Sequence, residues 1–129
     1  MTTQTTVRHA YAESSVMTAP PERLVVMLYD GAIRFLTQAA EAMRAGHRER
    51  ARERMRRAEA VIDELNLSLD MSHGEIPQRL RSLYLFAKRQ IVLSNLRGDP
   101  VHLDRLVPLL GELRESWARL ADEAIHPAQ

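Results

Sequence analysis

Side chains that could hold a metal ion are few and scattered along this chain. A carboxylate-bridged di-iron site in a helical bundle needs a Glu-x-x-His spacing on each of two helices. Glu123 and His126 have this spacing, but they lie beside Pro127 at the end of the last expected helix. The histidines are His9, His47, His73, His102 and His126, and no two of them have the spacing of a metal-binding pair. The chain has no cysteine, which excludes disulfides, thiolate metal sites and thiol catalysis. We expect no metal site and no cofactor.

The sequence also lacks the motifs of common catalytic sites. It contains no glycine-rich phosphate loop, no nucleophile elbow and no convergent pair of carboxylates. Tyr29, Asp30 and Gly31 place an acid beside a flexible residue, which could indicate catalysis. We interpret Asp30 instead as a surface or helix-pairing residue, and Gly31 as a position that lets another helix approach closely. We therefore predict that the protein is not an enzyme.

A run of arginines offers a second kind of chemistry, the binding of phosphates. It comprises Arg48, Arg50, Arg52, Arg54, Arg56 and Arg57. Glu49 and Glu53 stand three or four residues from several of these arginines, so pairing along the helix neutralises part of the charge. No aromatic residue interleaves with the run for base stacking. We predict a solvated helix face and no nucleic-acid partner, which agrees with a net charge of only +1.

Four long segments, separated by glycine and proline, must position whatever site exists. They span residues 21–45, 48–69, 77–98 and a last segment opened by Asp99-Pro100. In the second segment, apolar residues alternate four and three apart, which marks one face of a helix. These residues are Ala51, Met55, Ala58, Ile62, Leu65 and Leu69. The last segment keeps the same alternation, but Pro108 inside it predicts a kink, or a break between Leu106 and Val107.

These segments predict an all-α protein, an antiparallel up-down four-helix bundle over residues 20–126. Two variants stay open, a short extra N-terminal helix and a broken last helix. Residues 1–19 are expected to form a mobile tail or lid, and residues 127–129 a disordered end. The tail lacks the apolar run of a signal peptide. The longest apolar run in the chain, residues 24–29, is far shorter than the roughly 20 residues that span a bilayer, so we predict no membrane span.

The third segment carries more apolar surface than one core-facing stripe requires. Leu80, Leu83, Ala87 and Ile91 form one stripe, and Leu85, Val92 and Leu96 form another, with Phe86 and Leu93 at further angles. This helix is therefore either central and buried on most sides, or one wall of a groove, between the second and third segments, that receives a partner helix. In the polar tail, Tyr11, Val16 and Met17 are isolated apolar residues that could anchor it to the bundle.

Several motifs, in order and at matching spacing, resemble the flagellar export chaperone (FliS) family. The matching residues of the opening motif are Tyr11, Val16, Thr18, Ala19, Pro21, Leu24, Met27, Leu28, Tyr29, Asp30, Gly31 and Ala32. Residues 62–70, the Leu83-Tyr84 pair, Asn95 and residues 106–117 extend the resemblance over most of the chain. Two departures stand out. Pro20 replaces a serine that would cap the first helix, and Pro108 with Gly111 weakens the last one.

The resemblance implies a function that composition and spacing alone do not give. Members of this family are small helical bundles of the bacterial cytosol. They bind the disordered C-terminal segment of newly made flagellin, prevent its premature polymerisation and help deliver it to the flagellar type III export machinery. The segment becomes helical as it wraps around the chaperone. By the same resemblance, the tail around Tyr11 and Val16 is a lid over part of the binding surface, and a contact with the export gate is expected.

We therefore expect the flagellin segment to lie on apolar residues of the first three segments, beside the tail. The candidate contacts are Tyr11, Val16, Leu24, Val25, Leu28, Ile62, Leu65, Leu69, Leu83, Leu85, Val92 and Leu96, with Asn66 and Asn95 as polar anchors. Some of these must be core residues, and the sequence does not separate the two groups. The alternative is a self-associating structural bundle without a chaperone role, whose surplus apolar face is an isologous interface. The expected oligomeric state is a monomer or weak homodimer.

Overall fold

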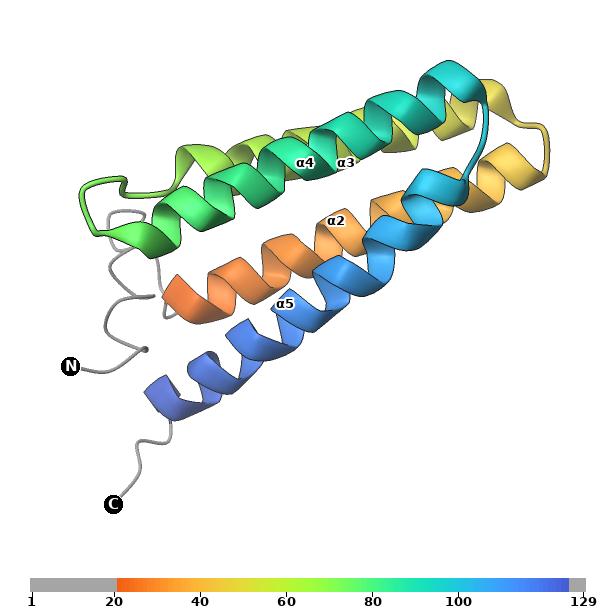
Figure 1. Cartoon of the computed structure of the whole chain (residues 1–129). Helices are drawn as coiled ribbons and strands as arrows, with labels where there is room; N and C mark the ends of the chain where they lie inside the picture. The colour runs from red at the N-terminus through yellow and green to blue at the C-terminus, as the bar shows by residue number, and fades with distance from the viewer. Residues whose placement is uncertain (1–20, 126–129) are drawn as a thin grey trace.

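The computed structural model describes residues 21–125, which fold into four α-helices. These are α2 (Pro21–Arg44), α3 (Arg48–Leu67), α4 (Glu75–Arg97) and α5 (Val101–Ile125). Successive helices run in opposite directions, and the described ranges contain no strand (Figure 1). The predicted all-α, up-down four-helix bundle is confirmed. The expectations for the N-terminal tail, for an extra N-terminal helix and for the C-terminal end fall outside the described residues.

Each helix packs against two neighbours, which closes the bundle around one core. Helix α2 packs against α3 and α5, and α4 packs against the same two helices from the other side. The α2–α3 and α4–α5 turns lie at one end, and the α3–α4 loop lies at the other (Figure 1). The buried side chains of α3 are Ala51, Met55, Ala58, Ile62 and Leu65, which continue the four-three alternation read from the sequence. That alternating face is therefore the core face of α3.

The helix ends follow local chemistry closely, with shifts of a few residues from the predicted bounds. Gly98 ends α4 in the left-handed conformation (φ 61°), which a residue without Cβ adopts at no steric cost. Asp99 caps the start of α5, because its Oδ1 accepts a hydrogen bond of 2.9 Å from the Val101 N–H. Helix α4 begins at Glu75, two residues before the predicted Pro77. Proline fits there because N–H groups of the first turn have no partner within the helix.

Pro108 does not break the last helix, so the predicted break between Leu106 and Val107 is wrong. Helix α5 is continuous from Val101 to Ile125 with Pro108 inside it. The ring lacks an N–H, so the carbonyl of Asp104 loses its helical partner. Pro108 and Asp104 are both exposed, so water can hydrate that carbonyl. On the core face, Leu103, Leu106 and Leu110 are all buried, so the same face packs inward on both sides of Pro108.

Two tyrosines join diagonally opposite helices through the core. The hydroxyl oxygens of Tyr29 on α2 and Tyr84 on α4 lie 2.8 Å apart, and the two rings are tilted by 52°. The side chain of Trp117 on α5 also hydrogen-bonds Tyr29. Burial raises the pKa of Tyr29 to about 12, against hydrogen bonds from Tyr84 and Trp117 that lower it. The neutral phenol is therefore part of what holds the bundle together.

Stability is expected to fall as the pH rises from about 10 to 12. An unfolded tyrosine ionises near pH 10, whereas Tyr29 in the folded protein keeps its proton until about pH 12. Below pH 10 the Tyr29 hydroxyl is protonated in both the folded and the unfolded state, so its contribution to the free energy of unfolding is constant. Above it the unfolded state loses the proton first, and up to about 2–3 kcal/mol of unfolding free energy is lost.

Denaturant unfolding at pH 9, 10, 11 and 12 measures this loss. Other groups also titrate in this range, so Tyr29→Phe is the comparison, because it removes only this hydroxyl. The variant should be less stable at pH 9 and should show a shallower decline with pH. An equal decline in both proteins would contradict the assignment.

Candidate functional site

The outer face of α4 carries a stripe of apolar side chains that no other described helix covers. Leu85 is 40% exposed, Phe86 42%, Val92 47% and Leu96 76%. Leu85, Val92 and Leu96 follow one another at spacings of seven and four, so they line one side of the helix, with Phe86 beside them. We call these four residues the α4 stripe. Such an exposed apolar row is typical of a surface that binds another molecule.

The opposite face of α4 is the one that packs into the bundle. Leu80, Tyr84, Ala87 and Ile91 are buried there. The interpretation of this segment as a central helix buried on most sides is therefore wrong. Two polar contacts hold α4 at its sides: the Lys88 ammonium donates to Asp63 of α3 at 2.7 Å, and Gln90 hydrogen-bonds His102 of α5 at 3.1 Å. Asp63 raises the pKa of Lys88 through this hydrogen bond.

The predicted contact residues divide into three groups by burial. Leu85, Val92, Asn95 and Leu96 are exposed, and all four lie on α4. Leu24, Leu28, Asn66, Leu69 and Leu83 are half-buried at the edges of the bundle. Val25, Ile62 and Leu65 are core residues with almost no exposed surface, so their placement on the binding surface is wrong. Tyr11 and Val16 lie outside the described residues.

Four further exposed apolar residues were not among the predicted contacts. Met27 is exposed on α2. Phe86 belongs to the α4 stripe, while Leu67 and Met71 are exposed at the end of α3 and in the loop that follows. The signal for Phe86 was present in the sequence, since it stands at a further angle on a helix with surplus apolar residues. Leu67 and Met71 fall where the helical pattern ends, so periodicity could not assign them to a face.

The basic residues near the stripe are largely free of partners. Arg81 and Arg89 are exposed on α4, and neither makes an ion pair with any residue between 21 and 125. Some of the α3 arginines behave differently: Arg52 pairs with Glu49 at 3.2 Å, and Arg57 pairs with Glu53. The predicted pairing within the arginine run is therefore confirmed. A partner lying along α4 would contact the α4 stripe and the positive charges of Arg81 and Arg89.

The acid at the Tyr-Asp-Gly motif has a structural role. The Asp30 carboxylate accepts hydrogen bonds of 2.8 and 3.3 Å from the Arg114 guanidinium, which ties α2 to α5. The prediction of a helix-pairing residue is thus confirmed. The prediction that Gly31 lets another helix approach is wrong for the described residues, because a Cβ there would meet only the Arg34 side chain, at 4.0 Å.

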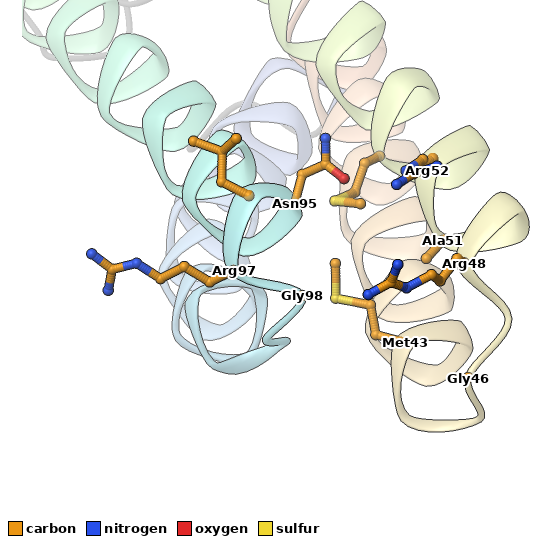
Figure 2. Close-up of a pocket in the computed structure, with 10 residues that line it drawn as sticks. Met43, Gly46, Arg48, Ala51, Arg52, Asn95, Arg97 and Gly98 are labelled. Atoms are coloured by element: carbon orange, nitrogen blue, oxygen red, sulfur yellow. The ribbon is translucent and has the colours of Figure 1, made fainter.

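A pocket of about 410 Å³ lies at the end of the bundle that holds the α2–α3 and α4–α5 turns. Met43, Ala51, Met55 and Leu96 supply its apolar surface, and Gly46, Arg48, Arg52, Asn95, Arg97 and Gly98 complete the lining. In Figure 2, Arg48 lies beside Met43, whereas the Arg97 side chain points away from the cavity. Leu96 belongs both to the pocket and to the α4 stripe, so the two surfaces are continuous.

The described residues contain no group of three His, Asp or Glu side chains placed to hold a metal ion. Among helices α2 to α5, none has a stretch long and apolar enough to cross a membrane. The candidate site consists of the α4 stripe and the pocket that adjoins it.

Comparison with known proteins finds one family. Residues 3–124 match the family model for the flagellar protein FliS. The chain is 32% identical over 108 residues to a flagellar secretion chaperone FliS of Bacillus subtilis, a match that covers 84% of this chain and 80% of the relative. It is 33% identical over 112 residues to the protein of that name in Vibrio cholerae, covering 86% and 82%. It is 33% identical over 114 residues to the one in Salmonella typhimurium, covering 87% and 84%.

Proposed function

Because this chain belongs to the FliS family of flagellar secretion chaperones, we propose that it binds the disordered C-terminal segment of flagellin in the cytoplasm. Binding prevents premature polymerisation into filaments and assists delivery of flagellin to the flagellar type III secretion apparatus. A non-catalytic role accords with relatives that are named as chaperones.

The observation that carries this proposal is the α4 stripe. A disordered segment loses conformational entropy when it becomes helical, and burial of apolar surface must offset that loss. From Leu85 to Leu96 the stripe extends over eleven residue steps, or about 16 Å of helix. That length matches about three turns of an amphipathic partner helix with apolar residues at helical spacing.

Individual residues have distinct roles in this proposal. The α4 stripe buries the apolar face of the flagellin segment, and Asn95 offers it a polar anchor beside Leu96. The exposed Arg89 favours acidic residues on the partner's flank. The half-buried Leu24, Leu28, Leu69 and Leu83, with Asn66, extend the contact at the edges of the bundle. Tyr11 and Val16 act as the lid, and the export gate is the next partner.

The polymerisation role is testable with purified flagellin monomers and sonicated filament seeds. Filament growth, followed by light scattering, should stop when this protein reaches one molecule per flagellin. Below that ratio the growth should fall in proportion to the free flagellin that remains. Unchanged growth at a threefold excess of folded protein would contradict the proposal.

The alternative function uses the same exposed stripe as an isologous interface between two copies of the chain. Sedimentation velocity over a hundredfold range of concentration separates the two. A monomer at all concentrations, or a dimer that dissociates when flagellin is added, favours the chaperone. A stable dimer whose sedimentation does not change when flagellin is added favours the structural bundle.

A further inference from the structure

We infer that the pocket at the end of the bundle receives the carboxyl terminus of the flagellin segment. Its α-carboxylate pairs with Arg48 and Arg52, and its last apolar side chain packs against Met43, Met55 and Leu96. This inference rests on the proposed function and adds a direction to it: the segment runs along the α4 stripe and ends in the pocket.

The size and the surface of the pocket fit the end of a chain. Its volume of about 410 Å³ lies in the range of cavities that hold one small ligand, about 300–1,000 Å³. Met43 and Leu96 stand at the rim with apolar surface still open, whereas Met55 is buried and forms the floor. Such a space takes a terminal residue or two, but not a further helical turn.

The charge of the pocket favours an anion. Arg48 makes no ion pair with any residue in the described part of the chain, and Figure 2 places it at the cavity. Arg52 forms one ion pair among the described residues, with the exposed Glu49 at 3.2 Å. No Asp or Glu lines the pocket to neutralise these arginines. Two guanidinium groups beside an apolar floor can hold a carboxylate through charge-assisted hydrogen bonds.

Helix α3, which carries both arginines, strengthens the preference of the pocket for an anion. Arg48 is the first residue of α3, and the preceding His47 makes no side-chain capping bond. The N–H groups of this first turn leave a partial positive charge at the same end of the helix. The Asn95 amide, also in the lining, provides a neutral donor from the α4 side.

The continuity of the two surfaces distinguishes a chain terminus from an internal acidic residue. A segment that follows the α4 stripe reaches the pocket through Leu96, which both surfaces share. The glycines Gly46 and Gly98, in the two turns at this end of the bundle, also line the pocket. A chain that stops there presents its carboxylate directly beside its last apolar side chain.

Three synthetic peptides that cover the flagellin C-terminal segment test the inference by fluorescence anisotropy against the full chain. The first has a free carboxyl terminus, the second ends in an amide, and the third continues with Gly-Ser-Gly. Amidation and extension should each weaken binding about fivefold to twentyfold, the effect of losing one or two charge-assisted hydrogen bonds at a partly exposed site. The double variant Arg48→Gln, Arg52→Gln should weaken binding of the free-acid peptide by the same factor as amidation does. All three peptides should then bind this variant with the same affinity.

Arg119→Gln, the same change at an exposed residue of α5 far along the chain from the pocket, is the matched control and should bind like the native protein. Equal affinity of the native protein for all three peptides would overturn the inference while the proposed function stands. Arginine variants that weaken all three peptides alike would also overturn it, because the pocket then holds a side-chain carboxylate. Failure of every peptide to bind would instead contradict the proposed function.

Discussion

Replacing Leu85 and Val92 together by aspartate is expected to weaken binding of the flagellin segment at least about a hundredfold, which corresponds to about 3 kcal/mol. Full burial of such a side chain contributes about 1.5–3 kcal/mol, and both residues are already more than half buried, so about 1 kcal/mol of contact is lost at each. Each aspartate also brings a charge against apolar partner groups, which adds a desolvation penalty of similar size or larger.

The double variant should keep its fold, because both side chains lie on the solvent side of α4. The helix propensity of aspartate lowers stability by about 0.5 kcal/mol at each position. Circular dichroism and thermal unfolding verify this, and anisotropy with the labelled flagellin peptide measures the affinity. Met27→Asp is the matched control, since Met27 is exposed on α2, the helix diagonally opposite. If both variants bind like the native protein, the α4 stripe is not the binding surface.

Replacing Ile62 by alanine is expected to have the opposite pattern of effects. Ile62 is fully buried against the other helices, and removing its side-chain carbons leaves a cavity. Such changes cost about 2–5 kcal/mol of unfolding free energy, so the melting temperature should fall by several degrees per kcal/mol. The affinity of the molecules that remain folded should be close to native, because Ile62 offers the partner no surface.

Denaturant unfolding measures the loss of stability, and titration at a temperature well below the transition measures affinity. Val61→Ala, at a half-buried neighbour on α3, is the matched control and should cost clearly less. A large loss of affinity with unchanged stability would contradict the assignment of Ile62 to the core.

The sequence predicted the helices well because their signals are local. Gly98, Asp99 and the four-three alternation of α3 act within one or two turns, so they can be read without a neighbour. The predicted break at Pro108 was wrong because the effect of a proline depends on whether it faces the solvent or the core. A proline on the solvent side of a helix costs one hydrogen bond that water replaces, and the buried leucines around it keep that stretch of α5 packed in the core.

The candidate site was less predictable, because burial depends on neighbouring helices. Ile62 and Leu85 are both apolar and both recur at helical spacing, yet one faces the core and the other faces solvent. Helix α4 has two apolar arcs, and only its packing between α3 and α5 decides which arc points inward. The pocket could not be predicted at all, since its lining comes from three helices and two turns.

The most direct test of the central claim is a calorimetric titration of this protein with the C-terminal flagellin segment of the same organism. One-to-one binding is predicted, with a negative heat-capacity change from apolar burial and a gain of helix in the circular dichroism of the mixture. Both signals should disappear in the Leu85→Asp, Val92→Asp variant and persist in Met27→Asp. Absence of binding by a fully folded bundle would contradict the account and favour the self-associating alternative.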